Sequence, residues 1–235
     1  MLFRSSKDVP DRSVSRDILG VGLPASVEYL LMSTLSIIIN AILVMVAGTD
    51  AVAVYTSGWR LLMFAVVPEI AIATTLISVI GAAYGARKYR NLTLAHGYAI
   101  RLGIMIAAVM AVLIFVFAGQ IALLFTYSET TAYLTPRIAS FLRVISVLLV
   151  FMPAGMLSLS VFQGTGRGFT SLVINLFRGL AFVAVFVVLF GIVLGYGETG
   201  VWIGIVLGNI LGSMVAYLWA RMYVRRLVLL EEQPA

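Results

Sequence analysis

The chain has 235 residues, of which 62% are hydrophobic and 11% charged, and its mean hydropathy is +1.08. This composition excludes a soluble globular domain, because no soluble core of this size can hide so much apolar surface. The absence of cysteine excludes disulfides and thiol chemistry, and the net charge of +6 comes from basic residues beside apolar segments rather than from a nucleic-acid-binding patch.

Apolar stretches long enough to cross a bilayer follow one another along the chain, separated by short loops. A membrane-spanning helix needs about 20 predominantly apolar residues. The sequence predicts six such helices, over 22–47, 52–83, 92–118, 137–162, 169–194 and 199–220. The second is long enough to be tilted, or bent at Pro68. The expected fold class is therefore all-α, a polytopic membrane protein.

The basic residues outside these stretches gather on one side of the predicted membrane. Eleven lie in the terminal segments and in the loops after the second and fourth stretches: Arg4, Lys7, Arg12, Arg16, Arg87, Lys88, Arg90, Arg167, Arg221, Arg225 and Arg226. The opposite side has Arg137 alone. Because Lys and Arg are enriched in cytoplasmic loops, both termini are expected in the cytoplasm. We expect a cytoplasmic leader over 1–17, a membrane lobe over 18–224 and a cytoplasmic tail over 225–235.

Ionisable side chains inside the predicted spans are the first candidates for a functional site, because charge is costly in hydrocarbon. Glu28 and Glu69 lie at nearly equal distances from the predicted turn at 48–50, so antiparallel helices hold them at similar depths. Arg178 reaches a comparable depth in the fifth helix. These residues are candidates for a cation- or proton-linked cluster, and a structural salt bridge between helices is the alternative.

Uncharged polar residues extend this set of candidates. Asn40 and Arg60 are also symmetric about the predicted turn and form a second layer nearer the outside. Asn175 precedes Arg178 by three residues, so both project from one face of the fifth helix. The alternative for Asn40 is a structural hydrogen bond to a neighbouring helix. The candidate site residues for ion or substrate are thus Glu28, Asn40, Arg60, Glu69, Asn175 and Arg178.

Aromatic residues and the histidine have simpler interpretations. Tyr55, Trp59 and Trp202 lie near the outer boundary, where anchoring at the membrane interface is expected. The alternative is that Tyr55, Trp59 and Met63 on the second helix line a cavity for a flat cation. His96 lies at the cytoplasmic end of its span and is expected to be solvated. Zinc would need three or four ligands, so we expect no metal site. With few groups able to act as nucleophile or base, we expect no enzyme activity.

Six different short motifs follow one another along the chain in a specific order. They are GLPAS at 22–26, SIIIN at 36–40, GTDAVAVY at 48–55, VIGAAYGARKYR at 79–90, LFT at 124–126 and FQGTGR at 162–167. Together they resemble the C-terminal half of transporters of the MATE (multidrug and toxic compound extrusion) family, over roughly residues 18 to 225. No single motif is strong, but their order and spacing are specific.

The resemblance implies one six-helix lobe of a twelve-span transporter whose two lobes enclose a cavity open to either side in turn. It implies an antiporter in a prokaryotic plasma membrane that exports organic cations, including drugs and other xenobiotics, in exchange for Na⁺ or H⁺, without another cofactor. A second six-helix lobe is then needed, either as a homodimer or as a split partner. Asn40 stands at a place resembling that of a cation-binding carboxylate in the family's other lobe, but an amide cannot release a proton.

Other functions remain alternatives at this stage. Lipid-linked sugar flippases share the overall architecture, and Arg60, Arg143 and Arg178 favour an anionic headgroup, whereas Glu28 and Glu69 favour cations. A membrane fragment that does not transport is a further alternative. The expected partners are the bilayer, a small-molecule substrate and the second lobe, and no nucleic acid.

Overall fold

The computed structural model describes residues 12–126 and 131–231, almost all of them helical. The first eleven residues of the expected leader and the last four of the expected tail therefore lie outside the described residues. The elements in chain order are α1 (Arg12–Ala47), α2 (Thr49–Gly85), α3 (Tyr89–Val116), α4 (Ala118–Phe125), η1 (Ala132–Leu134), α5 (Thr135–Gly164), α6 (Gly168–Leu176), η2 (Phe177–Val183), α7 (Ala184–Val188), η3 (Leu189–Val193) and α8 (Gly197–Glu231).

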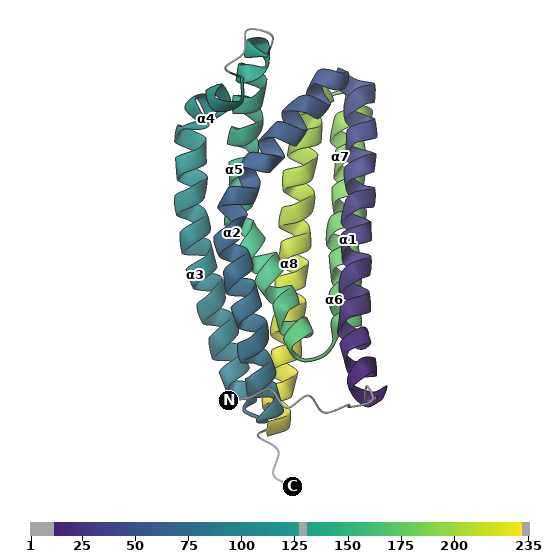
Figure 1. Cartoon of the computed structure of the whole chain (residues 1–235), viewed down its shortest axis with the longest axis vertical. Helices are drawn as coiled ribbons and strands as arrows, with labels where there is room; N and C mark the ends of the chain where they lie inside the picture. The colour runs from purple at the N-terminus through teal and green to yellow at the C-terminus, as the bar shows by residue number, and fades with distance from the viewer. Residues whose placement is uncertain (1–11, 127–130, 232–235) are drawn as a thin grey trace, which may run out of the picture.

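The predicted spans are confirmed as helices. Within the described residues, six helical segments are long and apolar enough to cross a membrane: Ser26–Ala47, Thr49–Gly85, Tyr89–Val116, Ala132–Gly164, Gly168–Val193 and Gly197–Glu231. The chain reverses where a glycine adopts a left-handed backbone, at Gly48 (φ 77°) between α1 and α2 and at Gly166 (φ 73°) between α5 and α6. Because the number of spans is even, α1 begins and α8 ends at the same end of the bundle (Figure 1).

Helix α5 lies at the centre of the lobe. It packs against α2, α3 and α8, whereas α1 packs mainly against α6 and α2 (Figure 1). One buried core fills the half of the bundle near the α1–α2 turn, around Tyr55, Phe141 and Trp202. A second core fills the other half, around Leu157, Phe162 and Tyr223. The lobe is thus held by apolar packing along its whole length.

A row of glycines on α8 lets the fifth span approach it closely. Gly200, Gly204, Gly208 and Gly212 recur every four residues, and a Cβ on any of them would meet the fifth span at 3.0 Å or less. Such small-residue rows mark close helix contacts in membranes. The row is visible in the sequence but was not among the predicted features.

The fifth span departs from the regular helix that its sequence predicts. It is divided into α6, η2, α7 and η3, and both η2 and η3 have π-helical hydrogen bonding. These π segments lie where the backbone faces the glycine row of α8. A π-helical turn widens the helix and is often found at functional sites. Here the first of them carries Arg178.

Candidate functional site

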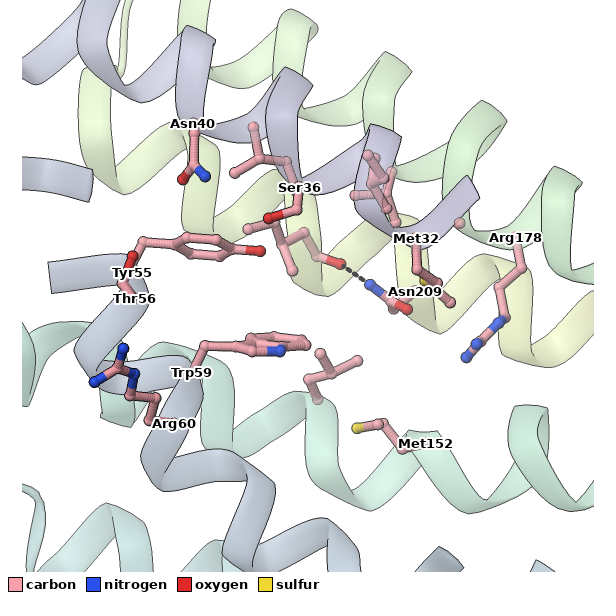
Figure 2. A pocket seen from close by; sticks show the side chains of 16 residues that line it. Met32, Ser36, Asn40, Tyr55, Thr56, Trp59, Arg60, Met152, Arg178 and Asn209 are labelled. Atoms are coloured by element: carbon pink, nitrogen blue, oxygen red, sulfur yellow. Dashed lines mark hydrogen bonds between the residues drawn. The ribbon is translucent and has the colours of Figure 1, made fainter. Parts of the chain in front are cut away.

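A cavity of about 300 Å³ opens between α1, α2, α5, η2 and α8. Its apolar lining comes from side chains such as Met32, Leu35 and Met152. Its polar lining consists of Ser36, Asn40, Tyr55, Thr56, Trp59, Arg60, Arg178 and Asn209 (Figure 2). Three of the six candidate residues from the sequence, Asn40, Arg60 and Arg178, therefore meet at one cavity, although their predicted depths placed Arg178 in a different layer.

Arg178 is buried, with 8% of its surface exposed. Its Nε and Nη2 donate hydrogen bonds to Oδ1 of Asn175, at 3.3 and 3.0 Å. The predicted shared face of these two residues is thus observed. Gly212 makes room for the arginine, because a Cβ there would collide with the Arg178 side chain. The guanidinium is held in place while Nη1 keeps no hydrogen-bond partner within the described parts of the chain.

Glu28 lies at the α1–α6 contact rather than in the lining of the cavity. The hydroxyl of Ser171 donates a hydrogen bond to its Oε1 at 3.1 Å, and Gln163 Nε2 donates to Ser171 at 3.2 Å. A chain of two hydrogen bonds from uncharged side chains therefore fixes the position of this carboxylate. Neither Ser171 nor Gln163 was among the candidates, because they follow Glu28 in the chain by more than 130 residues.

Glu69 is buried on α2, directly after Pro68, with 5% of its surface exposed. Its Oε1 has no hydrogen-bond partner among the described residues. A buried carboxyl oxygen without a partner is costly. Arg178 is within electrostatic range of both Glu69 and Glu28. The ion pairs within 4.0 Å in the described residues all involve Arg137, so the alternative of a direct salt bridge among Glu28, Glu69 and Arg178 is wrong.

Aromatic rings form one wall of the cavity. Tyr55 stacks on Trp59 at a centroid distance of 5.9 Å, and on Trp202 at the same distance with an interplanar angle of 6°. Tyr55 is 8% and Trp202 is 2% exposed. The expectation that these two anchor the lobe at the membrane interface is wrong, because their rings are buried against each other and against Phe141 of α5. Trp59 remains half-buried in the cavity wall.

His96 is also buried rather than solvated, with 5% of its surface exposed. Its Nε2 lies 3.2 Å from the hydroxyl oxygen of Ser158 on α5. Its ring packs near that of Tyr217 on α8. The expectation of a solvated histidine was wrong because α3 packs against α5 and α8 at this residue.

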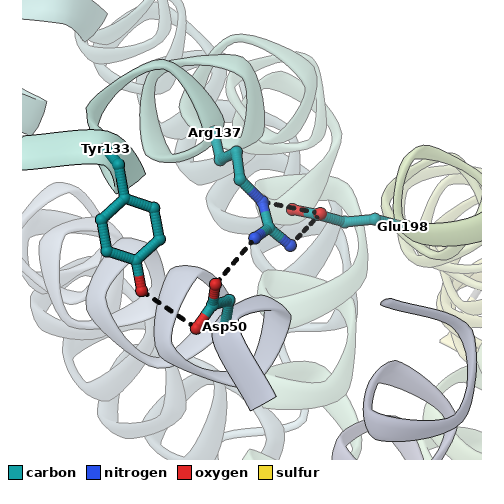
Figure 3. Close-up of polar contacts among 4 residues, drawn as sticks. All are labelled: Asp50, Tyr133, Arg137 and Glu198. Carbon is teal, nitrogen blue, oxygen red and sulfur yellow. Dashed lines mark hydrogen bonds and ion pairs between the residues drawn. The ribbon is translucent and has the colours of Figure 1, made fainter. Parts of the chain in front are cut away.

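Arg137 organises a polar cluster at the end of the lobe that holds the α1–α2 turn (Figure 3). Its Nε and Nη2 donate to Oε2 of Glu198, at 3.0 and 2.5 Å, and its Nη1 lies 3.5 Å from Oδ2 of Asp50. Tyr133 donates to Asp50 Oδ1 at 3.1 Å. The cluster ties the first turns of α2 and α8 to the start of α5.

Comparison with known proteins gives consistent results. A model of the MatE family matches residues 24–196. A structure described as "Crystal structure of MATE in complex with MaL6" is 41% identical with a TM-score of 0.90, over 93% of this chain and 49% of that one. An outward-facing multidrug resistance MATE transporter is 40% identical (TM-score 0.90), over 97% of this chain and 50% of that one.

A third structure is of a MOP superfamily transporter from Pyrococcus furiosus Vc1. It is 41% identical with a TM-score of 0.90, over 93% of this chain and 48% of that one, and its description says that reverse polarity of the binding pocket suggests a different function. No curated protein gave a match. The chain spans about half the length of the solved structures that it matches.

Proposed function

This chain belongs to the MATE transporter family, and from that premise we propose that it is one lobe of a secondary active transporter. The observation that carries the proposal is the cavity within the lobe, walled by α1, α2, α5, η2 and α8. Ligand sites in membrane transporters lie between helices that are broken or irregular near mid-membrane. The π-helical η2, which brings Arg178 to the cavity, is such an irregularity.

Ion coupling is assigned to two carboxylates, the buried Glu69 and the half-buried Glu28. Glu69 is unpaired at Oε1, and Glu28 accepts a hydrogen bond from a hydroxyl. Both can exchange a proton or contribute oxygens to Na⁺. Asn40, at the cavity, supplies an amide oxygen and no proton. We therefore assign the driving Na⁺ or H⁺ to Glu69 first and to Glu28 second.

Substrate class has two candidates. The first is export of organic cations, including drugs, which the carboxylates of Glu28 and Glu69 and the aromatic wall favour. The second is flipping of a lipid-linked sugar with an anionic headgroup, which Arg60 and Arg178 in the cavity lining favour. The relative with reversed pocket polarity supports considering the second.

A second six-helix lobe completes the proposed transporter, because the solved relatives are about twice as long as this chain. We propose that a second copy of this chain or a separate partner supplies it. The assembly is proposed to lie in the cell membrane with both termini in the cytoplasm, as the basic loops predict, and to act as a transporter rather than an enzyme.

The proposal is tested by flux through everted membrane vesicles from cells that make the chain. Uptake of a cation, ethidium, and of an anion, 8-anilinonaphthalene-1-sulfonate, is followed under an imposed Na⁺ or pH gradient. We expect gradient-driven uptake of one probe and its loss in Glu69→Gln. Glu231→Gln is the matched control, because Glu231 is exposed at the end of α8 and the amide oxygen of a glutamine can still accept the backbone hydrogen bonds that Tyr89 and Arg90 donate to its Oε2. Uptake of neither probe would refute transport and leave the alternative of a membrane fragment.

A further inference from the structure

The charge in the lining of the cavity has one sign. Arg60 on α2 and Arg178 on η2 lie at opposite ends of it (Figure 2), and among the described lining residues none is acidic. Arg60 makes no hydrogen bond or ion pair within the part of the chain that the structure describes. Guanidinium groups in a medium of low dielectric constant attract an anion and repel a cation more strongly than in water.

The nearest carboxylates do not reverse this balance. Glu28 and Glu69 act electrostatically on Arg178, so they offset part of its charge. Neither of them is among the residues that line the cavity. Arg60, whose side chain is exposed, forms no ion pair with another described residue, so the end of the cavity at α2 carries a positive charge that no described partner neutralises.

The middle of the cavity suits a flat body with polar edges. The stacked pair of Tyr55 and Trp59 provides an aromatic surface. Oδ1 of Asn40 is buried and has no partner among the described residues, so it is free to accept a hydrogen bond from a ligand. Asn209 donates through Nδ2 to the carbonyl oxygen of Ile205 at 2.9 Å, which leaves its Oδ1 as another acceptor.

We propose that this cavity binds an organic anion whose phosphate, sulfonate or carboxylate meets Arg60 or Arg178 while its ring packs on Tyr55 and Trp59. The inference rests on the proposed function and chooses the substrate class of that site. A cavity of about 300 Å³ is at the small end of ligand pockets, so one or two rings with a single charged group fit it. The ligand is either a soluble organic anion or the headgroup of a lipid.

The test is isothermal titration calorimetry on the chain in phosphatidylcholine nanodiscs, with empty nanodiscs subtracted. The probes are 2-naphthalenesulfonate and 2-naphthyltrimethylammonium, which share a ring system and differ in the sign of the charge. We expect the sulfonate to bind at least about tenfold more tightly. Arg60→Gln is expected to weaken sulfonate binding about tenfold or more, the loss of a charge-assisted hydrogen bond, and Arg60→Lys to restore most of it.

Controls separate the site from general electrostatics and from misfolding. Arg143→Gln removes an exposed arginine of α5 that does not line the cavity, and it is expected to leave the affinity unchanged. Arg178→Gln provides a second variant, and Arg60→Gln decides the question if Arg178→Gln fails to fold. Equal or tighter binding of the ammonium probe, or unchanged sulfonate affinity in Arg60→Gln, would overturn the inference.

Competition identifies the source of the anion. Displacement of the sulfonate by decyl phosphate alone assigns a lipid headgroup, and displacement by glucose 6-phosphate assigns a soluble anion. Displacement by neither overturns the inference. Sulfonate binding without gradient-driven flux in vesicles would refute transport and keep the anion site, whereas gradient-driven cation flux by an unmutated chain that does not bind the sulfonate would keep transport and refute the anion site.

Discussion

Replacing Gly204 of α8 with alanine tests the close contact between the last two spans. The new Cβ would lie 2.7 Å from the carbonyl carbon and oxygen of Phe186 and from Cα of Val187, where ordinary contact begins at 3.4 Å. All three are backbone atoms, so no side-chain rotation relieves the clash. The helices must separate by about 0.7 Å, which is the difference between these distances.

Overpacking of this kind costs about 1–3 kcal/mol, and the better helix propensity of alanine returns up to about 1 kcal/mol. For a chain of this length each kcal/mol lowers the melting temperature by about 2–4 °C. Taking about 2 kcal/mol from the middle of the overpacking range, less a return of up to about 1 kcal/mol, the net loss is about 1–2 kcal/mol. We therefore expect Gly204→Ala to melt about 2–8 °C below the wild type, as measured by scanning calorimetry in nanodiscs.

The matched control is Gly97→Ala on α3, where a Cβ meets nothing within 4 Å. At Gly97 only the higher helix propensity of alanine has an effect, so the melting temperature of Gly97→Ala is expected to stay the same or to rise. Equal melting temperatures for Gly204→Ala and Gly97→Ala would refute the argument that the glycine row sets the helix spacing.

Three further outcomes follow from single contacts. Glu69→Leu is expected to keep or raise the melting temperature, because it removes a buried oxygen without a partner, while gradient-driven flux is lost; a lower melting temperature would mean that the carboxylate is structural. Ser158→Ala leaves Nε2 of His96 unpaired and is expected to cost about 1–3 kcal/mol of unfolding free energy in calorimetry, whereas the exposed Ser78→Ala serves as the neutral control. Arg137→Gln is expected to lower the melting temperature at 20 mM NaCl more than at 500 mM, because salt screens its half-buried ion pairs; an equal loss at both concentrations would contradict an electrostatic role.

The spans were predictable because length and apolarity alone define them. The sequence-based ends agree with the helices to within a few residues at most boundaries. The contact between the fifth and sixth spans was readable only from the side of the sixth span, where Gly200, Gly204, Gly208 and Gly212 recur at helical spacing. It was missed because a glycine row identifies one side of a contact and not its partner.

The site was only partly predictable. Depth along each helix placed Asn40 and Arg60 together, and it placed Arg178 with Glu28 and Glu69. The rotation of each helix, which depth does not give, decides which side chains enter the cavity. Arg178 enters it from η2, whereas Glu28 turns toward Ser171. The burial of Tyr55 depends on neighbours from α5 and α8, so the residues near it in the sequence could not predict that burial.

The central claim is that this chain works as half of a two-lobed transporter, and native mass spectrometry of the complex tests it most directly. The tagged chain would be extracted from the cells that make it together with its surrounding lipids and without detergent. The account predicts a discrete complex of two six-helix lobes, either twice the 25.4 kDa of one chain or this chain with a second polytopic chain. A species of 25.4 kDa alone would contradict it.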